Sequence, residues 1–196
     1  MKPCPTLAVP GTSLSLSIGT PLHDPFLYRS TVGALQYHTN TRSDIAFIVN
    51  KLSYILKAST NIHWSIVERE LRYLAGTLHF GLTTNCDTYL NLTAYSEADW
   101  ASSIDDKKST AAYCLYLQST LISWSFKKQM TVARSSTESE YRAITHAATK
   151  IIWVKNLLTE IGFSPKGILV LWCDNMGAGA SVANPILCNE FSYLFF

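Results

Sequence analysis

The stretch TYLNLTAYSE, residues 88–97, alternates apolar and polar side chains, and it decides how the rest of the chain is interpreted. Its apolar positions include Leu92 and Ala94, and a period of two is typical of a β-strand with one buried face. Glu97 ends the stretch and Asp99 follows two residues later. Because acids at the end of a strand often build a metal site, the stretch predicts both a strand and a candidate site.

Two further segments with the same period follow it, TAAYCLYLQ at 110–118 and TLISWSFKK at 120–128. Short polar breaks separate them, which predicts an antiparallel meander of three strands. GILVLWCDN, at 167–175, is a continuous apolar run typical of a buried strand. We expect it to lie parallel beside the first strand, after a long crossover helix. The expected strands are 89–97, 110–117, 120–126 and 168–172, and the expected helix is 137–158.

The chain is predicted to have three regions. Residues 1–27 are rich in Pro, Ser, Thr and Gly and predict an extended or flexible arm. Residues 28–80 have helical periodicity, and from residue 81 to 196 the pattern is that of strands and helices. The fold class is therefore α/β, a mixed sheet preceded by a small helical region. The final residues show no clear period, so we expect the sheet to be incomplete at its C-terminal end.

The amino-acid composition limits the classes of protein to which the chain can belong. Hydrophobic residues make up 47% and charged residues 15%, which favours a packed core and excludes wholesale disorder. A net charge of +2 requires any contact with nucleic acid to rest on a local patch. The five scattered cysteines include no C-x-x-C pair, which is typical of reduced thiols. No signal peptide or membrane span is apparent, so we expect an intracellular protein, cytoplasmic or nuclear, without a membrane partner.

Three acids occupy comparable positions: Glu97 and Asp174 each follow a predicted strand, and Glu140 lies in the first turns of the long helix. Neighbouring strand ends converge in α/β sheets, and clustered carboxylates need a cation, for which magnesium is suited. Structural roles remain open on spacing alone. Glu140 can form a capping box with Thr137, Asp174 can cap the short segment that follows it, and Glu97 and Asp99 can be solvated turn residues.

Several short sequence motifs that follow one another along the chain identify a family more specifically than any single motif does. The chain resembles the C-terminal part of the Pol polyprotein of copia-type long-terminal-repeat retrotransposons, the end of the reverse transcriptase followed by ribonuclease H. The resemblance covers roughly residues 15–185. The matching blocks are YRSTVGALQY, TRSDIAFIVNKLS, HWSIVERELRYLAGT, AYSEADWA, DDKKSTAAYCLYL, LISWSFKKQ, SSTESEYRA and LWCDNMGA.

The resemblance implies a ribonuclease-H-like sheet and cleavage of the RNA strand of RNA–DNA hybrids by two magnesium ions held by four acids. By motif, three of these acids are Glu97, where the family has Asp, Glu140 and Asp174. The stretch that carries the fourth acid is absent, since ILCNEFSYLFF stands there. We therefore expect a truncated remnant with little or no activity. Its implied partners are an RNA–DNA hybrid and the reverse transcriptase portion of the parent polyprotein.

Two other functions remain open. One is a working nuclease in which Asp99 or Glu190 supplies an additional magnesium ligand. The other is a non-catalytic module that binds nucleic acid. The predicted nucleic-acid contacts are Lys127, Lys128, Arg134, Ser135, Ser136 and Asn175, because basic groups and a helix N-terminus suit phosphates. A solvated basic turn, with Ser135 and Glu138 capping the helix, is an equally good interpretation of these residues.

Overall fold

A computed structural model describes residues 2–7, 14–85, 91–163, 165, 169–175 and 177–178, and the backbone of 191–195. The chain divides into two compact units. Unit 1 comprises residues 1–82 and 103–105, and unit 2 comprises residues 83–102 and 106–196. Within the described ranges, no helix is both long and apolar enough to cross a membrane.

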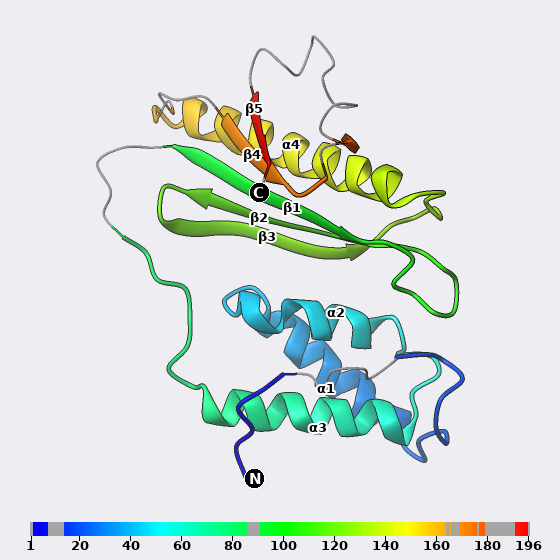
Figure 1. The fold of residues 1–196 in the computed structure, drawn as a ribbon. Helices are drawn as coiled ribbons and strands as arrows, with labels where there is room; N and C mark the ends of the chain where they lie inside the picture. Colours follow the sequence, from blue (N-terminus) through cyan, green and yellow to red (C-terminus); the bar gives the residue numbers. More distant parts are fainter. Residues whose placement is uncertain are drawn as a thin grey trace. The chain divides into compact units, whose positions relative to one another are not determined.

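Unit 1 is helical (Figure 1). Its elements are α1 (Pro25–His38), the 3-10 helix η1 (Ser43–Ile45), α2 (Ala46–Ser53) and α3 (Asn61–Gly76). They enclose one apolar core, which includes Tyr28, Val32, Ile45, Val49, Leu52 and Val67. The predicted arm, residues 1–27, is shorter than expected because α1 begins at Pro25. Its end is also fixed to the unit, since the N–H of Leu22 donates to the carbonyl of Ser59 at 3.1 Å.

Unit 2 contains a five-stranded mixed sheet in the order β3-β2-β1-β4-β5. The strands are β1 (Leu92–Asp99), β2 (Thr110–Leu117), β3 (Thr120–Lys128), β4 (Leu169–Cys173) and β5 (Phe191–Phe195). β1 pairs with β2, and β2 with β3, in antiparallel fashion, whereas β4 lies parallel beside β1. The predicted fold class, an α/β protein with a ribonuclease-H-like mixed sheet, is confirmed, and so is the position of the fourth strand.

The fifth strand corrects the expectation of a sheet that is incomplete at its C-terminal end. Phe191–Phe195 pairs in parallel with every residue of β4, so the sheet extends one strand beyond what the sequence predicted. A five-residue strand is too short to show a period. Its aromatic composition, however, is favourable for a strand.

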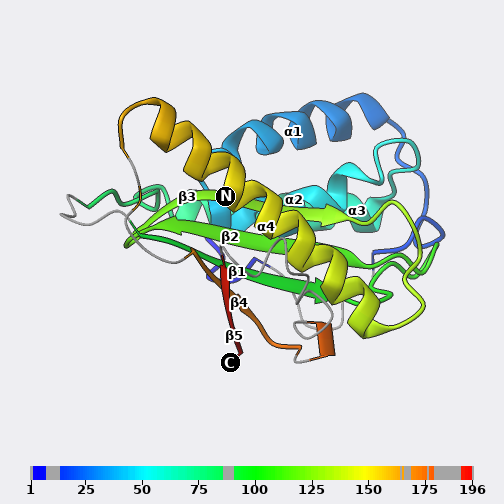
Figure 2. The same ribbon diagram turned by 90° about the horizontal axis from the view of Figure 1, so that it is seen from above.

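One face of the sheet is covered by α4 (Ser136–Glu160), and Figure 2 shows this long helix lying across the strands. Leu92 and Ala94 of β1 are buried in one cluster with Ile144 and Ile151 of α4. Tyr141 of the same helix is 41% exposed. Because side chains alternate along a strand, the positions between the buried β1 residues lie on the other face, and two of these are the acids Glu97 and Asp99.

The hairpin between β2 and β3 contains a strained residue. Leu117 pairs with Thr120, so the loop is Gln118 and Ser119, and Gln118 has a φ of 54°. A side chain in this left-handed region costs about 1 kcal/mol. We expect Gln118→Gly to raise the free energy of unfolding by about 0.5–1 kcal/mol in urea titrations. Ser119→Gly, the control at a position without positive φ, is expected to give no gain, and an equal gain would contradict this explanation.

Candidate metal centre

Three acids that are far apart in the sequence come together at one end of the sheet. Glu97, Glu140 and Asp174 each offer a carboxylate oxygen, and these oxygens all lie within 4.8 Å of one another. Glu97 is in β1, Glu140 is in the second turn of α4, and Asp174 directly follows β4. The predicted convergence of these three residues is therefore confirmed as geometry. Their roles as metal ligands and catalytic groups remain a prediction.

The sheet and helix create this meeting point. Parallel pairing between β1 and β4 reaches its last pair at Tyr95 and Trp172, whereas β1 continues to Asp99. Beyond that pair, the N–H of Ala98 donates to Oε1 of Glu140 at 2.8 Å. The carboxylate of Glu140 is thus held against the end of β1. This bond excludes the alternative in which the Glu140 carboxylate caps its own helix with Thr137.

Glu140 is the buried member of the cluster, with 4% of its surface exposed. Its second oxygen, Oε2, is buried without a hydrogen-bond partner. The pKa of Glu140 is raised to about 7, mainly by burial, with the hydrogen bond from Ala98 lowering it and the charges of Asp174 and Glu97 adding to the rise. A buried carboxylate oxygen without a partner is costly, so this position favours either a proton or a cation.

Glu97 is exposed at the same site. Its carboxyl group is nevertheless partly shielded from water, and this desolvation raises its pKa, as do the charges of Asp174 and Asp99. Asp99 is on the same face of β1 as Glu97, because the strand continues to that residue. It acts on Glu97 through its charge but is not one of the three residues that gather at the cluster.

The residues after β4 show which side chain caps the short turn there. Oδ1 of Asn175 accepts a hydrogen bond from the N–H of Ala178 at 2.9 Å. Asn175, rather than Asp174, therefore supplies the cap that the sequence left open. The Asp174 carboxylate belongs to the acid cluster. Glu190, considered as a further ligand, lies outside the described residues.

The two predicted lysine contacts lie at the end of β3. Lys127 is exposed, and Nζ of Lys128 forms an ion pair with Oδ1 of Asp106 at 2.9 Å. β2 separates β3 from β1, so these lysines are two strands away from Glu97, or about 10 Å across the sheet. The structure does not bring them into the acid cluster, and their contact with nucleic acid remains a prediction.

The predicted contacts at the start of α4 include a structural cap. Oγ of Ser135 accepts from the N–H of Glu138 at 3.1 Å, and the Glu138 carboxylate accepts from the N–H of Arg134 at 2.7 Å. The interpretation of Ser135 as a helix cap is confirmed. The side chains of Arg134 and Ser136 are exposed beside it, where their role toward phosphates remains a prediction.

The chain is similar to segments of much longer retrotransposon proteins. It is 43% identical over 193 residues to the retrovirus-related Pol polyprotein from transposon RE2 of Arabidopsis thaliana, covering 98% of this chain and 13% of that protein. It is 44% identical over 193 residues to the corresponding polyprotein from transposon RE1 of the same plant, with the same coverage, 98% and 13%. The chain thus spans 13% of the length of these curated relatives.

Two other comparisons are less informative. No family model matches the chain. A solved structure of the foamy viral protease-reverse transcriptase in complex with dsDNA is similar with a TM-score of 0.43 and 11% sequence identity, over 87% of this chain and 37% of that chain. The relationship is therefore shown by sequence identity along nearly the whole chain. The chain belongs to the family of retrovirus-related Pol polyproteins of copia-type retrotransposons, of which it represents a segment.

Proposed function

We propose that unit 2 is a remnant of a retrotransposon ribonuclease H domain, that its three clustered acids hold magnesium, and that it has little or no activity on RNA–DNA hybrids. The observation that carries this proposal is the approach of Glu97, Glu140 and Asp174 to within 4.8 Å. Glu97 lies in β1, Glu140 in α4 and Asp174 directly after β4, and sequence motifs alone predict all three for one site.

The residues present fit magnesium. All three donors are carboxylate oxygens, which this ion prefers, and the buried Oε2 of Glu140 has no protein partner. When bound, magnesium supplies neutralisation of the clustered charge and activation of water toward a phosphodiester. Glu140, fixed by Ala98, orients the site, while the carboxylates of Glu97 and Asp174 are exposed and therefore accessible to a substrate phosphate.

Two features of the acid site account for the proposed low activity. Glu97 is one methylene longer than the Asp of the family motif, and a misplacement of about one bond length can cost roughly a hundredfold in rate. The family site uses four acids, and three gather among the described residues. By the same resemblance, unit 1 represents the end of the reverse transcriptase portion, and its partner is the rest of that portion in the parent polyprotein.

A cleavage assay on a labelled RNA–DNA hybrid, with the full chain and added magnesium, tests this proposal. We expect cleavage at background rate by the unmodified chain and also by Glu97→Asp, because one restored carboxylate does not supply a fourth ligand. Binding of the same hybrid without cleavage would fit the alternative of a nucleic-acid-binding module. Robust magnesium-dependent cleavage by the unmodified chain that Asp174→Asn abolishes would overturn the proposal in favour of a working nuclease.

A further inference from the structure

Unit 1 buries an acid at a position where its helix presents an apolar face. Ile66, Val67 and Tyr73 are buried positions of α3, and Glu70 lies among them, one turn from each. Glu70 is 0% exposed, and neither of its carboxylate oxygens has a hydrogen-bond partner. An ionised carboxylate in such a place is strongly unfavourable unless it is paired.

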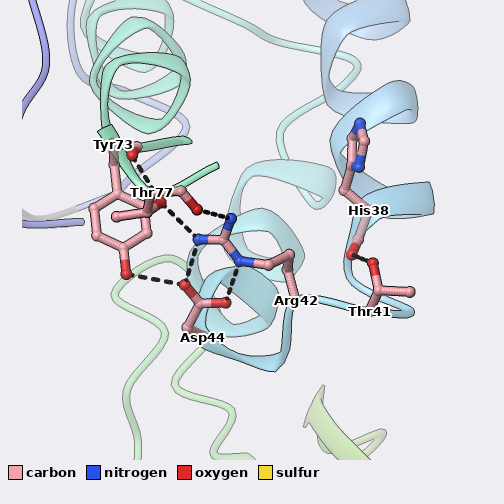
Figure 3. A network of polar contacts seen from close by, with 6 residues as sticks. All are labelled: His38, Thr41, Arg42, Asp44, Tyr73 and Thr77. Carbon is pink, nitrogen blue, oxygen red and sulfur yellow. Dashed lines mark hydrogen bonds and ion pairs between the residues drawn. The ribbon is translucent and has the colours of Figure 1, made fainter. Parts of the chain in front are cut away.

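Arg42, the cation whose charge acts on Glu70, is already bound to other groups (Figure 3). Nε and Nη2 of Arg42 donate to the two oxygens of Asp44 at 2.9 and 2.7 Å. Nη1 and Nη2 also donate to the carbonyl and hydroxyl of Thr77 at 3.0 and 2.8 Å. Four of the five N–H groups of the guanidinium are thus used. Tyr73 adds a hydrogen bond to Asp44 at 2.9 Å.

Two charges therefore act on Glu70: the like charge of Asp44, and the opposite charge of Arg42, which is already paired with Asp44. Both residues lie in the segment that leads into α2. On its own helix, Arg69 donates to Thr6, and the Nε groups of Arg69 and Arg72 are buried without a hydrogen-bond partner, so neither is paired with Glu70. The titratable neighbours that also lie along α3 are Tyr73, one turn later, and His63, two turns earlier, which is itself fully buried.

The pKa of Glu70 is raised to about 8, mainly by burial of its carboxyl group and also by the charge of Asp44, against the charge of Arg42, which lowers it. An acid whose pKa is higher in the folded state binds its proton more tightly there. Its contribution to stability is complete below the ordinary value of 4.5 and is lost as the pH rises through about 8.

We propose that Glu70 is a pH-sensitive switch within unit 1, which keeps α3 packed while its buried carboxyl group is protonated and lets the helix open locally when the proton is lost. The geometry supports this because no described side chain hydrogen-bonds to the carboxylate and Arg42 is held by Asp44 and Thr77. An ionised Glu70 must therefore either compete with Asp44 for Arg42 or reach water. Either outcome disturbs the contact between α3 and the segment that leads into α2.

Hydrogen exchange of the α3 amides in the full chain, followed by mass spectrometry and corrected for intrinsic rates, measures this opening. The pH range starts at 6.5, because burial lowers the pKa of His63 from that value, so that its neutral form predominates over the whole range. From there to the pKa of Glu70 we expect the opening equilibrium to increase about tenfold per pH unit. Glu70→Gln is expected to remove this dependence of the opening equilibrium on pH, because glutamine keeps the shape of the side chain but does not ionise.

Glu68→Gln is the matched control, because it removes a carboxylate from the same helix and keeps the oxygen that accepts from Trp64. We expect it to retain the slope of this pH dependence. Equal slopes in the unmodified chain and in Glu70→Gln would overturn the proposal, as would a flat profile in the unmodified chain. If Glu70→Gln does not fold, Glu70→Leu takes its place at this apolar position, where a flat profile supports the switch and an unchanged slope refutes it.

Discussion

Replacement of Asp174 by asparagine is expected to stabilise the chain in the absence of metal and to weaken its response to magnesium. The oxygens of Glu97, Glu140 and Asp174 lie within 4.8 Å of one another, and like charges at such a distance repel. Removing one charge from a partly exposed cluster should increase the free energy of unfolding by about 1–2 kcal/mol. Urea titrations in a chelator measure this change.

Magnesium should reverse the order of stability of the unmodified chain and Asp174→Asn. A ligand at a hundred times its dissociation constant stabilises a folded protein by about 2.7 kcal/mol, and we expect the unmodified chain to gain an amount of this order. Asp174→Asn, with one ligand fewer, should gain much less. Titrating magnesium during the same unfolding experiment tests for the crossing of the two curves.

Glu160→Gln is the control for this experiment. It removes an acid from the last residue of α4, about 30 Å along the helix from Glu140. It should leave both the metal-free stability and the response to magnesium nearly unchanged. An equal response to magnesium in Asp174→Asn and the unmodified chain would contradict a metal site at the acid cluster, whatever the result of the hybrid cleavage assay.

Replacement of Arg42 by methionine is expected to cost about 3 kcal/mol of the free energy of unfolding, because it leaves buried partners unpaired. Arg42 has 8% of its side chain exposed, and its ion pair with Asp44 is 2.7 Å long. Its loss also removes the donors to Thr77 and the positive charge beside Glu70. Urea unfolding at neutral pH measures the loss.

Arg142→Met is a matched control for burial. Its ion pair with Glu138 is equally short, at 2.6 Å, but both side chains are about one-third exposed, at 33% and 35%. An exposed pair of this kind contributes less than about 1 kcal/mol. A larger loss from Arg142→Met than from Arg42→Met would show that contact distance, and not burial with its unpaired partners, determines the contribution of these arginines.

Local patterns in the sequence were enough to predict the strands β1 to β4 of unit 2 and their order in the sheet. Alternation in β1, β2 and β3 gave the meander, and the apolar run of β4 indicated a buried strand between neighbours. Motif resemblance assigned Glu97, Glu140 and Asp174 to one site. The strand at Phe191–Phe195 was not predicted, because a short segment becomes a strand when a neighbouring strand, here β4, offers free backbone groups to pair with.

The sequence by itself determined which acids are candidates for the metal centre and that β1 to β4 belong to the sheet beside it. Both depend on periodicity and on motifs that are local along the chain. Only the tertiary structure decided what each acid does. In the folded chain, Glu140 accepts a hydrogen bond from Ala98 at the end of β1, and Asn175, not Asp174, caps the turn after β4. The tertiary structure also encloses Glu70 without a partner while Arg42 is held by Asp44. Spacing along a helix shows which residues share a face, but the energy of a carboxylate depends on its solvent exposure and its nearest donor, and both are set by segments that are distant in the sequence.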